Sequence, residues 1–92
     1  MSIGPVSGFE GDTLEVNASA IDGDLRVEVL DVEGKLIPGF SREECEPIQV
    51  DSVHHGVTWK KDGGLRSLKG KIIKLRFYLT FAKLYAFQFK SA

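Results

Sequence analysis

Cysteine is nearly absent from this chain, which has 92 residues and a single cysteine, Cys45. One cysteine excludes an internal disulfide, and with it a small fold held together by cross-links. Long apolar runs are also missing, since no segment approaches the roughly 18 apolar residues that a membrane-spanning helix needs. The opening residues, MSIGPV, lack the basic start and apolar run of a signal peptide, so we expect no cleaved leader here.

An excess of charge of either sign is lacking too, because the net charge is −1. This value favours neither a nucleic-acid partner nor a membrane surface. The two halves differ, however: residues 1–51 hold twelve acidic and three basic residues, and residues 52–92 hold nine basic residues and one acidic. Binding of single-stranded nucleic acid would need several aromatic side chains on the basic face, where only Tyr78 is expected. We interpret the asymmetry as opposite charges that meet across paired strands.

What the chain does contain is stretches in which polar and apolar residues alternate, the pattern of half-buried strands. The longest covers residues 71–81. The last, residues 84–89, is apolar on both faces, as a central or covered strand would be. The other predicted strands cover residues 13–18, 25–29, 35–38 and 53–60, with a hairpin turn at Glu33-Gly34.

About six short strands in this length predict one domain, residues 1–92, with an all-β fold: a small, jelly-roll-like antiparallel β-sandwich. The stretch IPGFSREEC, residues 37–45, interrupts the strand pattern. Its Ser41-x-x-Glu44 spacing is a capping box, which predicts one short helical turn near residues 41–45 that Pro47 stops. We expect Cys45 to point inward. The predicted aromatic core consists of Phe40, Trp59, Phe77, Phe87 and Phe89.

A family resemblance rests on five motifs, which span roughly residues 14–89 of the chain. They are Pro38-Gly39-Phe40-Ser41, Glu44-Cys45, Trp59, Leu68-Lys69-Gly70-Lys71 and Leu84-Tyr85-Ala86-Phe87-Gln88-Phe89. In this order they resemble the C-terminal β-sandwich domain of bacterial glycoside hydrolases similar to glycoside hydrolase family 32 and the sialidase-like five-bladed propellers. The segment 60–64 departs from that pattern, and the pair His54-His55 is not part of it.

The resemblance implies a function without catalysis. In such enzymes the catalytic carboxylates lie in the propeller, which this sequence lacks. The chain would then be an excised or stand-alone accessory domain, not an enzyme, that gives structural support to a catalytic propeller domain. The alternative is a carbohydrate-binding module that recognises a polysaccharide or oligosaccharide. An extracellular or periplasmic location is suggested by the resemblance alone.

A carbohydrate site needs an exposed aromatic ring with polar neighbours, because a sugar ring stacks on an apolar face while its hydroxyls seek hydrogen bonds. Tyr78 meets this description best, since it shares the polar face of its strand with Lys74, Arg76 and Thr80. Trp59 shares its predicted face with valines and is assigned to the core. Phe9 is a weaker candidate.

Catalytic and metal sites are not expected. The acidic residues within 43–46 fit a helix start better than a glycosidase pair. Cys45 could form a nucleophile only with His54 or His55, and nothing in the sequence brings them together. Adjacent histidines on a strand point to opposite faces, so they do not share one metal ion. Asp22-Gly23-Asp24 is predicted to be a plain turn rather than a calcium site. No cofactor is expected.

Overall fold

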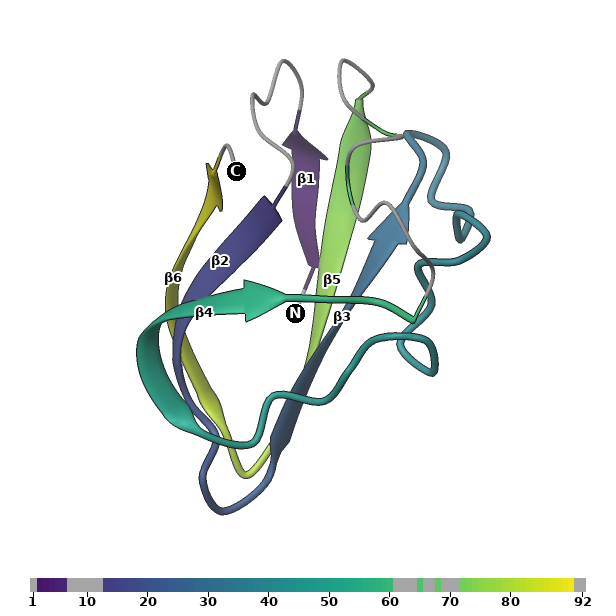
Figure 1. The fold of residues 1–92 in the computed structure, drawn as a ribbon. Helices are drawn as coiled ribbons and strands as arrows, with labels where there is room; N and C mark the ends of the chain where they lie inside the picture. The colour runs from purple at the N-terminus through teal and green to yellow at the C-terminus, as the bar shows by residue number, and fades with distance from the viewer. Residues whose placement is uncertain (1, 7–12, 61–64, 66–67, 69–71, 91–92) are drawn as a thin grey trace.

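The computed structural model forms two three-stranded antiparallel sheets packed face to face (Figure 1). It describes residues 2–6, 13–60, 65, 68 and 72–90. Sheet A has the strand order β1-β5-β3, and sheet B has the order β4-β2-β6. The strands are β1 (Ser2–Val6), β2 (Thr13–Ser19), β3 (Asp24–Leu30), β4 (Asp51–Val57), β5 (Ile73–Thr80) and β6 (Lys83–Lys90). The predicted antiparallel β-sandwich is confirmed.

The chain moves from one sheet to the other at every connection between strands. Sheet A takes the odd-numbered strands and sheet B the even-numbered ones, so no two consecutive strands pair with each other. This alternation gives the sandwich its jelly-roll-like path. The sequence pattern missed β1, and residues 35–38 form no strand, because only an isolated bridge joins Leu36 to Leu30. No helix in the described part of the chain is long and apolar enough to cross a membrane.

The core lies between the sheets and is built by the alternation that the sequence shows. Of the aromatic residues predicted for it, Phe40, Trp59 and Phe77 are buried. The rings of Phe40 and Trp59 meet edge to face, with centroids 5.3 Å apart. Phe87 and Phe89 are only partly buried against the core. The aliphatic part of the core comes from alternate positions on β2, β3 and β5: Leu14, Val16, Ala18, Leu25, Val27, Val29, Ile73 and Leu75.

The connection between β3 and β4 covers the outer edge of β3 without forming a strand. Near its end, Leu25 and Ile48 exchange two backbone hydrogen bonds of 2.9 Å each. Near its beginning, the Val29 N–H donates to the Phe40 carbonyl at 3.0 Å, and the Ile37 N–H donates to the Val29 carbonyl at 3.1 Å. Irregular chain therefore satisfies backbone groups that an edge strand would otherwise expose.

Between these two points, side chains take over the role of a neighbouring strand. The Val27 N–H donates to the Cys45 Sγ at 3.4 Å, and the Trp59 indole Nε1–H donates to the Val27 carbonyl at 3.0 Å. The predicted helical turn places Cys45, because its N–H donates to the Ser41 carbonyl at 3.0 Å. The Ser41 hydroxyl accepts from the Glu44 N–H and donates to the Glu44 carboxylate at 2.9 Å. The IPGFSREEC stretch is thus a structural cover for β3.

Four sequence predictions about exposure are wrong. Phe81 does not continue the buried face of β5: the strand ends at Thr80, and Phe81 is 85% exposed with a φ of 48°. Val53 was placed on the face of Val57 and Trp59, but a bulge turns it outward. Leu30 was expected to expose one side to an apolar patch for a partner domain, but it is buried because the following connection folds back over it.

The fourth error concerns β6, which was expected to be central or covered. It is instead an edge strand of sheet B, and five of its eight residues are exposed. The sequence also predicts a break at Asp62-Gly63-Gly64 after the strand at 53–60 and a connector at 65–70. These residues lie outside the described part of the chain, apart from Leu65 and Leu68, which are buried.

Candidate functional site on the outer faces of the sheets

The outer face of sheet A carries the residues that the sequence indicated for sugar binding. Tyr78 and Arg76 lie on β5 and both contact Glu28 on β3. The Tyr78 hydroxyl donates to the Glu28 Oε1 at 2.8 Å, and the Arg76 guanidinium donates to the same oxygen at 3.1 Å. Lys74 and Thr80 flank them on the same strand, half-buried and exposed respectively. The sequence reasoning missed Glu28, which is only 6% exposed.

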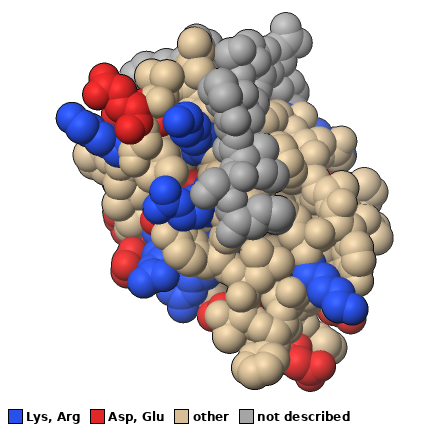
Figure 2. All heavy atoms as spheres, turned by 180° about the vertical axis from the view of Figure 1, so that it is seen from behind, with Lys and Arg blue, Asp and Glu red and all other residues tan. Residues whose placement is uncertain are grey.

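Tyr78, Arg76 and Glu28 satisfy one another's hydrogen bonds, although the Arg76 side chain is still 42% exposed. The guanidinium carbon of Arg42 lies 4.6 Å from the centre of the Tyr78 ring, a cation–π contact. Hydrogen bonding to Tyr78, followed by the charge of Glu28, raises the pKa of Arg76 above its ordinary value, so this guanidinium stays protonated. Figure 2 shows the molecule from behind, so β3 and its following connection, on the right of Figure 1, are now on the left. On that side, Lys and Arg side chains lie beside acidic ones. A ligand that stacks on the covered face of Tyr78 would have to displace Arg42.

The outer face of sheet B differs because both neighbours of β2 bulge at the same place. Between Val16 and Ala18 of β2, β4 carries one residue more than β2 does. Between Asn17 and Ala18, β6 also carries one extra residue, Tyr85. Bulges bend a strand and redirect a side chain, and they occur often beside functional sites. Here they leave Tyr85 62% exposed and Val53 64% exposed.

Tyr85 and Val53 line the same shallow hollow, about 600 Å³ in volume. Its other walls come from the ends of β2 and β4 and include four polar residues beside Ala18: Asn17, Ser19, Asp51 and Ser52. The Ser19 hydroxyl donates to the Asp51 carboxylate at 2.7 Å, and Ser52 Oγ accepts from the His54 N–H at 3.2 Å. An exposed ring therefore lies beside side chains whose orientation is already fixed.

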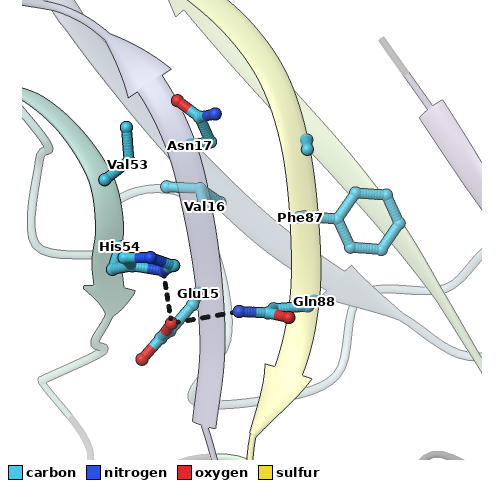
Figure 3. A pocket seen from close by; sticks show the side chains of 8 residues that line it. Glu15, Val16, Asn17, Val53, His54, Phe87 and Gln88 are labelled. Atoms are coloured by element: carbon cyan, nitrogen blue, oxygen red, sulfur yellow. Dashed lines mark hydrogen bonds and ion pairs between the residues drawn. The ribbon is translucent and has the colours of Figure 1, made fainter.

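A second hollow of about 200 Å³ continues the first across the sheet, because both are lined by Asn17 and Val53 (Figure 3). At its centre the Glu15 carboxylate contacts two side chains from the flanking strands. His54 Nδ1 lies 3.5 Å from the carboxylate, and Gln88 Nε2 donates to it at 3.3 Å. Figure 3 shows these three side chains directed toward one another. Lys90 Nζ lies 3.7 Å from the other carboxylate oxygen.

The residues considered for catalysis or metal binding have structural contacts instead. Cys45 is buried between Val27 and the helical turn, and burial raises the pKa of its thiol. A raised thiol pKa leaves little thiolate near neutral pH, so Cys45 is a poor nucleophile. Among residues 2–6, 13–60, 65, 68 and 72–90, no three His, Cys, Asp or Glu side chains form a group that could hold a metal ion. Asp22 and Asp24 flank a turn in which the Gly23 N–H donates to the Ala20 carbonyl.

One end of the sandwich carries exposed apolar side chains. Ile21, in the β2–β3 turn, and Phe81, in the β5–β6 connection, line one open hollow, and both connections lie at the lower end of Figure 1. Val50 is also exposed there, and its carbonyl accepts from the N–H of Ala20. We call Ile21, Val50 and Phe81 the apolar end.

The comparisons with known proteins identify no relative. No family model, no curated protein and no solved structure matches the chain. The resemblance to the glycoside hydrolase domain therefore remains a hypothesis from the sequence motifs. The sequence reasoning missed the outer face of sheet B, because nothing in the sequences of β4 and β6 marks the two bulges that expose Val53 and Tyr85. Phe9 lies outside the described residues.

Proposed function

We propose that this chain is a non-catalytic accessory domain that binds carbohydrate through the outer face of sheet B. The observation that carries the proposal is the pair of bulges opposite Asn17, which exposes Tyr85 and Val53 beside fixed polar groups. The site is open and shallow, as a polymer-binding surface must be if a long chain is to lie across it. The glycoside hydrolase context rests on the sequence resemblance alone.

The chemistry of the surface suits a sugar ring. A pyranose has an apolar face of C–H groups that stacks on an aromatic side chain, and it has hydroxyls around its rim. Tyr85 offers the ring, while the Asn17 amide and the Asp51 carboxylate offer a donor and acceptors in the same hollow. Farther along the sheet, Glu15 and Gln88 offer further polar partners for a neighbouring sugar unit.

We propose a domain without catalysis because the side chains that could act as nucleophile, acid or base already make structural contacts. Cys45 is buried and accepts a backbone hydrogen bond. Glu44 closes the helical turn through Ser41. Glu15, on the proposed surface, already contacts a histidine, a glutamine and a lysine. Retaining and inverting glycosidases instead require two carboxyl groups facing each other across the sugar bond.

A second candidate is structural support of a catalytic partner domain, as the family resemblance implies. The apolar end favours it. A phenylalanine with positive φ is uncommon, because a side chain destabilises this backbone conformation by about 1 kcal/mol or more. At Phe81 this cost is combined with an exposed ring. A partner surface that covered Ile21, Val50 and Phe81 would give the exposed ring a role.

The experiment is an amide chemical-shift titration of the ¹⁵N-labelled domain with cellohexaose, xylohexaose, chitohexaose and laminarihexaose. We expect saturable shifts at Asn17, Val53 and Tyr85 with at least one of them. Tyr85→Ala should weaken binding about tenfold or more, because it removes the apolar surface that a stacked sugar would cover, and burying an apolar side chain is worth about 1.5–3 kcal/mol.

Tyr78→Ala is the matched control, since it removes a tyrosine from the other sheet. If Tyr78→Ala abolishes binding and the shifts cluster at Lys74, Arg76 and Tyr78, the site is the one that the sequence indicated. If no amide shifts at millimolar sugar, carbohydrate binding is disproved and structural support becomes the leading function.

A further inference from the structure

The outer edge of β6 is a surface that the proposed carbohydrate site does not use. β6 pairs with β2 on one side only, and its register with β2 is continuous from Ala86 to Lys90. On the open side of an edge strand, alternate N–H and C=O groups point away from the sheet. Apart from β2, no segment in the described part of the chain donates a hydrogen bond to the backbone of residues 85–88 or accepts one from it.

The other edges of the two sheets carry features that discourage an added strand. The edge of β3 is covered by the connection that follows it. β1 contains Pro5, which has no N–H to offer, and a register shift. β4 contains a bulge and Gly56. β6 has one bulge near its start, but it contains no proline, no glycine and no acidic residue.

The charges on β6 select the kind of strand that could pair with it. Lys83 and Lys90 are its first and last residues, and both are exposed, although Lys90 Nζ also lies 3.7 Å from the Glu15 carboxylate. If two β6 strands paired antiparallel over their full length, Lys83 of each would face Lys90 of the other. Like charges directly opposite each other destabilise a strand pair. A strand with carboxylates at its ends would instead place opposite charges there.

We propose that the outer edge of β6 binds an extended segment of another polypeptide, with an acidic residue near each end, as a fourth strand of sheet B. Backbone hydrogen bonds would provide the affinity and alternate side chains the specificity, as in other cases of strand addition. An added strand would also cover the partly buried ring of Phe87 on the core side. The proposal does not depend on carbohydrate binding, since it concerns the edge of the sheet rather than its face.

The test is a titration of the ¹⁵N-labelled domain with two synthetic peptides, acetyl-Glu-Val-Thr-Val-Thr-Val-Glu-amide and the same peptide with lysine in place of both glutamates. We expect the acidic peptide to shift the amide signals of residues 85–88 and to slow their hydrogen exchange. The lysine peptide should bind about tenfold more weakly, because it reverses the charge at both ends.

The variant Lys83→Glu/Lys90→Glu should reverse this preference, whereas Lys74→Glu on sheet A should leave it unchanged. Lys83→Glu alone serves if the double variant is poorly folded through repulsion between Glu15 and the new residue at 90. Equal binding of both peptides, or shifts at another edge, would overturn the proposal, as would no shift at millimolar peptide. So would concentration-dependent shifts of β6 without peptide, which would mean that a second copy occupies the edge.

Discussion

The strands β3 and β6 are similar in length and in apolar content, yet their outer edges are in opposite states. The edge of β3 is closed by the Phe40 and Ile48 carbonyls, by the Cys45 sulfur and by the Trp59 indole. Residues 85–88 of β6 receive no such cover from the residues that the structure describes. Two strands of similar length and apolar content therefore differ in burial: five of the seven residues of β3 are buried, whereas five of the eight residues of β6 are exposed.

The difference follows from the length of the chain beside each strand. The connection after β3 spans residues 31–50, which is long enough to turn at Gly34 and return along the strand. The connection before β6 spans only residues 81–82, which is too short to run along any edge. A sandwich of this size thus closes an edge only where a connection is long enough to lie along it.

Removing the anchor of the closed edge should have the largest effect. Phe40→Ala deletes a fully buried ring that packs on Trp59, and we expect it to lower the free energy of unfolding by about 3–5 kcal/mol. Urea denaturation followed by tryptophan fluorescence measures this. Tyr85→Ala, on the open side, should change stability by no more than about 0.5 kcal/mol. Comparable losses for the two variants would mean that the two edges do not differ as described.

Removing a single hydrogen bond at the closed edge should have a smaller effect. Trp59→Phe keeps an aromatic ring but deletes the N–H that donates to the Val27 carbonyl. A buried acceptor left without its donor destabilises by about 1–3 kcal/mol. Denaturation followed by circular dichroism tests this, because the variant lacks tryptophan fluorescence. A variant as stable as the native chain would show that solvent reaches the Val27 carbonyl.

The buried thiol at the closed edge predicts a dependence on pH. Burial raises the pKa of Cys45, so above the unfolded value of about 8.5 the folded chain holds a proton that the unfolded chain has lost. Stability should be unaffected by this group below that pH and should fall above it, by at most about 1.4 kcal/mol per pH unit. Cys45→Ala should lack this contribution between pH 8 and 9.5. Parallel curves for the two proteins would contradict the prediction.

Neutralising the ends of the open edge should leave stability nearly unchanged while increasing aggregation. Lys83→Gln/Lys90→Gln removes the charges that oppose pairing between copies, and we expect a change of less than about 0.5 kcal/mol in stability. Thioflavin fluorescence at high concentration should rise sooner than for the native chain. Lys74→Gln on sheet A is the control, and equal aggregation of the two variants would remove the special role of β6.

The fold class and three of the five predicted aromatic core residues could be predicted because they depend on local patterns. Period-two alternation over residues 71–81 identified β5, and the Ser41-x-x-Glu44 spacing identified the helical turn. Phe40 and Trp59 were expected in the core, and both are buried there. These features require only that apolar side chains leave water and that a capping side chain meets a free N–H.

The candidate site could not be predicted in the same way because it depends on register. One extra residue in β4 and one in β6 turn Val53 and Tyr85 outward, and nothing in either strand's own sequence marks the insertion. Tyr78 had the expected position on a polar face, but its contacts with Glu28 and Arg42 come from other parts of the chain. Which strand forms an edge is likewise a property of the whole topology.

The alternation of the strands between the sheets also has a consequence for folding. Because each strand pairs only with strands that are not its neighbours in sequence, no local hairpin can form first and act as a template. Folding of β proteins dominated by such distant pairings takes milliseconds to seconds. Sheet B gains its last strand only when residues 83–90 are available, so β2 must wait for β6 during synthesis on the ribosome. Until then sheet B is incomplete, and the unpaired edge of β2 can associate with other chains.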